Sequence, residues 1–307
     1  MTVSAPAAAG LPAPSGSASL IVSREDDTFA PNVAFRAEIE LALDDPTLPT
    51  AISVFTGGGA AAALAFEKVD ARWFHAWSYG SFDEIKSALN GTWTIEIMGS
   101  VPSVSTFTFA ANALEQVNFF ESPQVTHPVD GAPGVLPTVV TTWLPPTAGP
   151  FPAYILDAWI DYGAPDGPGS SPGPAEFLDT SSTSWDPEGL LLPGLSRFTV
   201  EYGVAAPPNL VGPLIVTSGA MRWSTPRIAP PGYPAPAPLI ALTGRTRIAF
   251  TVVPCPDSAD LDCDGAVSGA DLGLLLANWG NAGTGDVNHD GVVDGADLGV
   301  LLGSWTG

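Results

Sequence analysis

Residues 260–279 read DLDCDGAVSGADLGLLLANW, and residues 286–305 read DVNHDGVVDGADLGVLLGSW. When Asp260 is aligned with Asp286, 12 of the 20 aligned positions are identical. Each copy has oxygen-bearing side chains at positions 1, 3, 5, 9 and 12 and a glycine at position 6. The repeated spacing indicates a duplicated structural unit, and it decides how this end of the sequence folds.

The spacing within each copy is the calcium-loop pattern. A calcium ion takes six to eight oxygen ligands at about 2.3–2.6 Å, and a loop of twelve residues can wrap around the ion to supply them. The glycine at position 6 permits the sharp turn that lets the following carbonyl point inward. In the first copy the predicted ligands are Asp260, Asp262, Asp264, the Ala266 carbonyl, Ser268 and Asp271. In the second copy they are Asp286, Asn288, Asp290, the Val292 carbonyl, Asp294 and Asp297. The expected cofactor is therefore calcium, as two ions.

The alternative is a solvated, acidic tail that is rich in turns. Two copies in register argue against this alternative, and so do the residues that follow each loop. Apolar residues recur there at i, i+3, i+4 and i+7, which predicts one short amphipathic helix after each loop. These residues are Leu272, Leu275, Leu276 and Trp279 in the first copy and Leu298, Leu301, Leu302 and Trp305 in the second.

A helix precedes the loop of an ordinary EF-hand, but here residues 253–256 (VPCP) precede the first loop and residues 281–285 (NAGTG) the second. A duplicated unit of one loop and one helix, with Asp at loop position 12, resembles the type I dockerin family. The resemblance implies attachment to a cohesin-like or other cell-surface protein, and polysaccharide as a possible ligand of the whole protein. Dockerins often carry side chains that contact cohesin at loop positions 10 and 11. We expect the small residues found there to let a partner approach the backbone closely; they are Gly269, Ala270, Gly295 and Ala296.

The net charge limits the possible partners. The sequence has 32 acidic residues against 10 basic ones, a net charge of −22, which argues against nucleic acid or an anionic membrane surface. All ten bases lie before residue 254, whereas residues 254–307 contain nine Asp and no base. The acidity is thus concentrated where cations are expected. No apolar run reaches the roughly 18 residues of a membrane-spanning helix, so no transmembrane segment is predicted.

The two cysteines, Cys255 and Cys263, are separated by seven residues at the start of the acidic segment. They predict a small disulfide loop if the protein is exported, and a pair of free thiols is the alternative. The dockerin resemblance implies an extracellular or cell-surface location. Residues 1–18 lack the basic start of a secretion signal, and we interpret them as a flexible leader.

The remaining sequence predicts a mainly β fold, because 33 Gly and 32 Pro favour many short strands joined by turns. Alternating apolar residues predict strands at 33–43, 52–55, 73–79, 92–98, 105–109, 139–144, 154–162, 198–204, 214–223 and 246–253. A single short helix is expected over 81–89, with Ser81 as N-cap and Glu84 completing a capping box. Residues 228–238 are expected to form an extended, polyproline-like loop.

These patterns give a fold class of two β-sandwich-like domains followed by a small α-helical, calcium-binding, dockerin-like module. The expected boundaries are 1–18 for the leader, 19–121 for a β-rich domain, 122–254 for a β-sandwich and 255–307 for the module. The middle domain resembles fibronectin type III or related immunoglobulin-like domains. The resemblance rests on residues 128–131 (PVDG), Trp143, Pro145-Pro146, Trp159, Ser184-Trp185, residues 192–194 (LPG) and Phe198.

The sequence contains no constellation of residues that indicates catalysis. Neighbouring acids such as Asp26-Asp27 would point to opposite faces of a strand and could not flank one substrate. The alternating aromatic residues of 73–79 either line a sugar-binding face or pack into a core, and core packing is favoured. We therefore expect a binding and attachment protein. The alternatives are a polysaccharide-degrading glycoside hydrolase that carries a dockerin, and a purely structural cell-surface protein.

Overall fold

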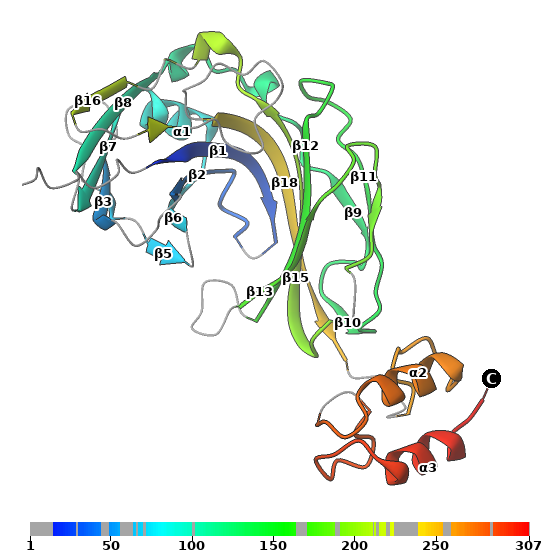
Figure 1. Cartoon of the computed structure of the whole chain (residues 1–307). Coiled ribbons are helices and arrows are strands. Elements are labelled where there is room, and N and C mark those ends of the chain that lie inside the picture. Colours follow the sequence, from blue (N-terminus) through cyan, green and yellow to red (C-terminus); the bar gives the residue numbers. More distant parts are fainter. Residues whose placement is uncertain are drawn as a thin grey trace, which may run out of the picture. The chain divides into compact units, whose positions relative to one another are not determined.

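The chain is mainly β, with helices α1 (Phe82–Leu89), α2 (Gly269–Ala277) and α3 (Gly295–Gly303) among the described residues (Figure 1). The computed structural model describes residues 15–28, 30–43, 49–55, 64–65, 67–69, 72–99, 102–163, 171–187, 191–210, 212, 215–218, 222–223, 239–253, 259–282 and 285–306. Within these ranges no helix has the length and apolar character needed to cross a membrane. The predicted polyproline-like loop at 228–238 lies outside the described residues.

The strands are β1 (Ser15–Asp27), β2 (Phe35–Leu43), β3 (Pro49–Phe55), β4 (Leu64–Ala65), β5 (Glu67–Val69), β6 (Arg72–Tyr79), β7 (Gly91–Gly99), β8 (Ser103–Phe109), β9 (Gln124–His127), β10 (Ala132–Val135), β11 (Thr141–Leu144), β12 (Ile155–Tyr162), β13 (Ser171–Phe177), β14 (Ser184–Trp185), β15 (Gly194–Ala205), β16 (Ile215–Ser218), β17 (Arg222–Trp223) and β18 (Leu239–Val252). Short 3₁₀ turns occupy Ala111–Ala113, Gln116–Asn118 and Pro208–Leu210.

The chain divides into two compact units whose segments interleave along the sequence. Unit 1 comprises residues 1–122, 146–156 and 201–245, and unit 2 comprises 123–145, 157–200 and 246–307. The first cut, after Ser122, falls beside the boundary expected at 121/122. After that cut the chain passes between the two units several times. Three of these crossings fall inside strands, so β12, β15 and β18 each contribute residues to both units. The three sequential domains stay a prediction.

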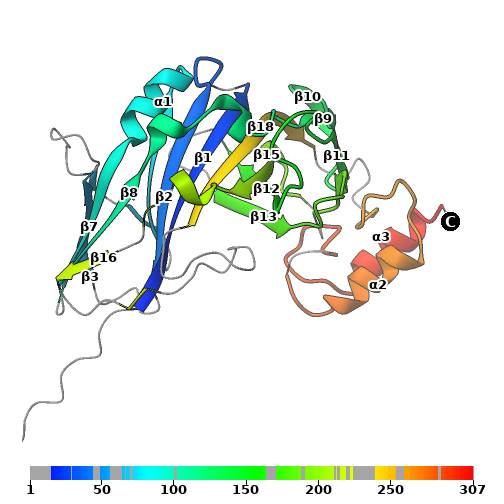
Figure 2. The same cartoon turned by 90° about the horizontal axis from the view of Figure 1, so that it is seen from above.

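Strands of two sheets lie in unit 1 (Figure 2). Side chains of both sheets contribute to one hydrophobic core. In one sheet the strand order is β18-β1-β2-β6-β5, and in the other it is β16-β8-β7-β3-β4. Alternate residues of β1 and β2 are buried, as period-two patterns require. The core takes side chains from both sheets and from α1, including Leu20, Ile39, Trp93, Phe107 and Ile85.

Trp73 of β6 belongs to this core, and Trp77 and Tyr79 pack against it. Antiparallel pairing places Trp73, His75 and Trp77 opposite Leu41, Ile39 and Ala37 of β2, so they share the core face. Trp73 is buried, and Trp77 packs edge-on against Trp93 with ring centroids 5.8 Å apart. The structure thus supports core packing, the interpretation that the sequence favoured for these residues.

Helix α1 begins as its sequence predicts. The Ser81 hydroxyl accepts a hydrogen bond from the Glu84 amide, and the Glu84 carboxylate accepts one from the Ser81 amide. This reciprocal capping box satisfies backbone donors that the first turn leaves unpaired. Ile85 and Leu89 then pack into the core of unit 1. The predicted helix and its cap are confirmed.

Unit 2 contains the three-stranded sheet β14-β11-β9, together with β13 and parts of β12, β15 and β18, which follow one another in the order β13-β12-β15-β18 within the ten-stranded sheet that also includes β1. Phe198 of β15 is fully buried, with its ring 5.9 Å from Trp143 and 6.1 Å from Trp185, centroid to centroid. These three aromatic residues belong to the set that carries the fibronectin resemblance. Their packing explains why they are large and apolar, and the resemblance itself stays a prediction.

Two sequence predictions are wrong in their limits. Strand β1 begins at Ser15, inside the segment expected to be a flexible leader, because Ser15 pairs with Arg222 and Gly16 pairs with both Trp223 and Leu43. A Cβ on Gly16 would lie 2.4 Å from the Ala42 carbonyl oxygen, so glycine permits this close pairing. The strand expected at 214–223 is two strands, since β16 pairs with β8 and β17 pairs with β1.

Candidate metal centre in the repeated loops

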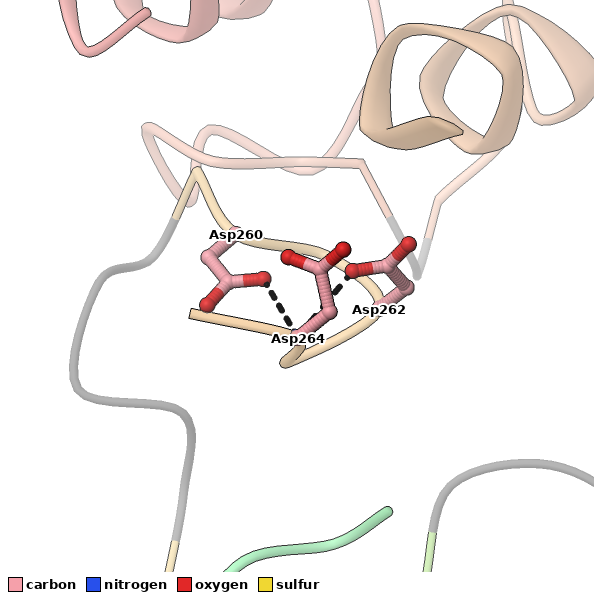
Figure 3. Close-up of side chains that lie close together, drawn as sticks. All are labelled: Asp260, Asp262 and Asp264. Atoms are coloured by element: carbon pink, nitrogen blue, oxygen red, sulfur yellow. Dashed lines mark hydrogen bonds between the residues drawn. The ribbon is translucent and has the colours of Figure 1, made fainter. Parts of the chain in front are cut away.

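In the first acidic loop, backbone amides donate hydrogen bonds to the aspartate side chains of the same loop (Figure 3). Asp260 accepts backbone hydrogen bonds from Asp264 at 3.1 Å and from Gly265 at 3.0 Å, one on each carboxylate oxygen. Asp262 accepts from the Asp264 amide at 3.2 Å, and Asp264 accepts from the Ala266 amide at 2.8 Å. The three carboxylates are thereby held on one side of a tight turn.

The second loop repeats this pattern at the equivalent positions of its own sequence. Asp286 accepts from the amides of Asp290 at 3.0 Å and Gly291 at 2.9 Å. Asn288 accepts from the Asp290 amide at 2.9 Å, and Asp290 accepts from the Val292 amide at 3.1 Å. Every backbone bond of the first loop named above thus has its counterpart in the second. The two copies of the repeated sequence therefore adopt the same hydrogen-bonded loop structure.

The two loops also share their backbone conformation. Gly265 and Gly291, at loop position 6, have φ of 94° and 96°, in the left-handed region that favours glycine. Cys263 and His289, at position 4, are the non-glycine residues with positive φ in the described part of the chain, at 58° and 62°. Non-glycine residues adopt this region only where the surrounding structure requires it. The loop conformation is therefore specified and not a relaxed turn.

The last acid of each loop is buried and closes the loop onto the start of its helix. Asp271 accepts from the amides of Leu261 at 2.6 Å, Asp262 at 3.2 Å and Ser268 at 2.7 Å, and Asp297 accepts from the equivalent three amides. Burial opposes ionisation of Asp271, but these amides outweigh it and hold its pKa below the usual value. The equivalent amides, that of Asp294 first, lower the pKa of Asp297. Both residues stay ionised at neutral pH.

The residues at loop positions 9 and 12 also cap the helices, a role that the sequence reasoning missed. Ser268 is the N-cap of α2 and Asp294 the N-cap of α3, each accepting from the amide two residues on. The signal was present in the sequence, because Ser-x-x-Asp and Asp-x-x-Asp precede apolar runs in the manner of a capping box. The same residues thus order the helix and complete the loop.

Three acids come close enough to share one cation. Ligand oxygens of Asp260, Asp262 and Asp264 lie within 4.8 Å of one another. Burial, followed by the neighbouring carboxylates of Asp271, Asp264 and Asp260, raises the pKa of Asp262. The second loop has one acid fewer at these positions, because Asn288 replaces the acid, and its amide nitrogen donates to Asp290 at 3.1 Å.

The donor set fits a hard divalent cation such as calcium. All predicted side-chain ligands are oxygens, the ligand type that calcium takes, and close carboxylates without a base repel one another unless a cation intervenes. The predicted carbonyl ligands, Ala266 and Val292, directly follow the position 6 glycines. Each of the two has its amide hydrogen-bonded to the preceding acid of its loop.

Helices α2 and α3 pack together around a small core of their own (Figure 1). This core contains Ala259, Leu261, Val267, Leu275, Val287, Val293 and Leu301, with Leu272 and Leu298 packed against it. The predicted apolar face is therefore only half right. Leu276 is 52% exposed and Trp279 46%, and their counterparts Leu302 and Trp305 are 53% and 41% exposed. Such short helices bury only one row of side chains against each other.

The predicted contact residues lie at the start of these helices. Gly269, Ala270, Gly295 and Ala296 are all exposed, and a Cβ added to either glycine would meet nothing within 4 Å.

Cys263 is disulfide-bonded. The sequence holds one other cysteine, Cys255, which lies outside the described residues. The bond would fix the entry to the first loop.

A buried ionic cluster in unit 1 was not anticipated. Arg245 of β18 donates to one oxygen of Glu201 at 3.0 and 3.2 Å and lies 3.7 Å from Glu25, and all three side chains are at most 6% exposed. Burial raises the pKa of Glu201, and the attraction of Arg245 only partly offsets it. Both carboxylates are bound to the same guanidinium, which gives them a structural role.

No family model matches this chain, and no curated protein sequence matches it. What the site does must therefore be argued from its own residues.

Proposed function

We propose that this protein is an extracellular, calcium-binding attachment protein whose dockerin-like module, residues 255–307, binds two calcium ions and docks the β units onto a scaffold or cell surface. The observation that carries the proposal is the repetition of one hydrogen-bonded loop geometry in two acidic segments, 260–271 and 286–297. A chance acidic turn would not reproduce the same donors, acceptors and positive φ values twice.

The charge of the segment supports calcium as the ion. Residues 254–307 contain nine Asp and no Lys or Arg, so this segment supplies no lysine or arginine as a positive partner for its loop carboxylates. Residues of the first loop would hold one ion and residues of the second loop the other, each set offering carboxylate, amide or hydroxyl and carbonyl oxygens. The bound ion supplies the positive charge that keeps the loop closed.

Exposed apolar side chains on each helix, or within two residues of its end, support attachment. Leu274, Leu276 and Trp279 of the first repeat are exposed, and so are the equivalent Val300, Leu302 and Trp305 of the second. Solvent-exposed indoles and leucines that recur at equivalent positions are typical of a surface that a protein partner covers. The dockerin resemblance names the partner class as a cohesin-like or other cell-surface protein.

The β units would then act as binding or spacer modules, with polysaccharide as a ligand to test. Trp73, Trp77 and Tyr79 of β6 give no support to sugar stacking, since they pack into or against the core. The buried acids Glu25 and Glu201 of unit 1 give no support to hydrolysis, since Arg245 binds both of them. The attachment function is therefore preferred to a glycoside hydrolase.

Calorimetry of the full chain with calcium tests the proposal. We expect two sites in the native protein, one site each in Asp260→Ala and Asp286→Ala, and none in the double variant. Asp26→Ala, an exposed acid of β1, is the matched control and should keep both sites. A native chain that binds no calcium, or a double variant that still binds two ions, would remove the proposal.

A further inference from the structure

Each loop is hydrogen-bonded to the residues that follow the helix of the other repeat. Val293 of the second loop accepts from the Gly280 amide at 2.8 Å and donates to the Asn281 carbonyl at 2.9 Å. Val267 of the first loop accepts from the Thr306 amide at 3.0 Å and donates to the Thr306 hydroxyl at 2.8 Å. The two valines are both at loop position 8, and Gly280 and Thr306 also occupy equivalent positions of the two repeats.

The two contacts differ in one respect. The second loop is held by two backbone bonds, which no side-chain substitution removes directly. The first loop is held by one backbone bond and one bond to a side chain, Thr306 Oγ1. The first loop alone therefore depends on the chemistry of a single replaceable side chain.

The Thr306 hydroxyl can orient the Ala266 carbonyl, a predicted calcium ligand, because it binds the amide of the same peptide group. The amide of Val267 and the carbonyl of Ala266 belong to the same planar, trans peptide group, so they point in opposite directions. When Thr306 holds the Val267 N–H on one side, the Ala266 carbonyl is directed to the other side. Val267 is 2% exposed, so its amide has no alternative partner in bulk water.

We infer that Thr306 is a positioning residue for the first calcium loop, which aims the Ala266 carbonyl into the loop through its hydrogen bond to Val267. This inference rests on the proposed function. It assigns to the second repeat a part in building the site of the first. Asn281 does the corresponding work for Val292 with its backbone carbonyl.

Thr306→Val tests the inference, because valine keeps the shape of threonine and removes the acceptor. Losing this bond leaves a buried amide unpaired in the closed loop, which should weaken calcium binding at the first site by about five- to tenfold. Thr306→Ser retains the hydroxyl and should restore the native affinity. Thr251→Val, at an exposed position of β18, is the matched control and should have no effect.

The two sites are separated by working with the full chain in two backgrounds. Asp286→Ala leaves the first site and Asp260→Ala leaves the second, and calorimetry with calcium is done in each with and without Thr306→Val. We expect weakening in the first background and a change of less than about twofold in the second. Hydrogen exchange of the Val267 amide in saturating calcium should accelerate in Thr306→Val and not in Thr306→Ser.

Two results would overturn the inference while leaving the proposed function intact. One is calcium binding at the first site that Thr306→Val does not change. The other is an equal loss at both sites, which would make Thr306 a general stabilising residue. A native chain that binds no calcium would remove both the inference and the function on which it rests.

Discussion

The backbone amide of Leu261 donates a 2.6 Å hydrogen bond to Oδ1 of Asp271, ten residues further along the chain. This bond joins the second position of the first loop to its last, so the protein's own hydrogen bonds contribute to closing the loop. Asp271 is fully buried and accepts two more amides, from Asp262 and Ser268. An amide side chain has only one acceptor oxygen and cannot replace a carboxylate with three donors.

We therefore expect Asp271→Asn to weaken the first loop with or without calcium. At least one amide loses its acceptor, which costs about 1–3 kcal/mol when the donor stays buried. Calcium affinity at the first site should fall, and circular dichroism in chelator should show less helix than in the native chain. Asp26→Asn, on the exposed part of β1, serves as the control. Unchanged helicity in chelator would contradict the closing role of Asp271.

The two loops differ in charge at position 3, and exchanging these residues should exchange their affinities. Asn288→Asp adds a carboxylate to the second loop and should tighten its site roughly tenfold, while Asp262→Asn should weaken the first site by a similar factor. Calorimetry at low and at high ionic strength checks the cause, because screening by salt reduces the contribution of an exposed carboxylate. An affinity order that does not follow the charge would refute the argument.

Partner capture should depend on the exposed small residues at the helix starts. Replacing Ala270 and Ala296 together by Arg places two long, charged side chains where the surface is open. Immobilised full chain should then lose the binding of cohesin-type domains in calcium, and calorimetry should still find two calcium sites, since neither side chain is a ligand. Capture that survives the double change would move the docking surface elsewhere.

The buried carboxyl of Glu201 should make the stability of unit 1 depend on pH. Its pKa in the folded chain lies above the ordinary 4.5, so the folded chain keeps a proton that the unfolded chain has already lost. The stabilising effect of this proton is fully present below about pH 4.5 and is lost as the pH rises through the folded value. Glu201→Gln imitates the protonated form.

Urea unfolding measures this effect as a difference between Glu201→Gln and the native chain. The difference in midpoint should change in favour of the variant as the pH rises from 4 to 8, because only the native residue loses its proton. Glu115→Gln, at an exposed position, should show no such trend. A constant difference across the pH range would mean that Glu201 is ionised throughout.

Local features of the fold could be predicted from the sequence, because the residues that decide them are neighbours. The cap of α1 at Ser81 and the alternation of β2 are fixed within a few residues of the chain. The pairing of strands is not local. That residues 215–218 join β8 while residues 222–223 join β1 depends on partners from much earlier in the sequence. The pattern of apolar residues in the segment 214–223 does not indicate that it forms two strands with different partners.

The candidate site shows the same division. The ligand types and the glycine at position 6 follow from the spacing of Asp260, Asp262 and Asp264 alone. The contact from Thr306 to Val267 joins residues 39 apart and follows from the packing of one repeat on the other. The Arg245 cluster could not be predicted from the sequence, because Glu25, Glu201 and Arg245 lie on three strands that are far apart in the chain.

Strands β1 and β18 are neighbours in one sheet, so β1 can complete its pairing only after β18 has been synthesised. About 210 residues separate the end of β1 from the start of β18, and closing so long a segment slows folding. Until the ribosome has delivered residues 239–245, β1 presents an unpaired edge that other chains can join.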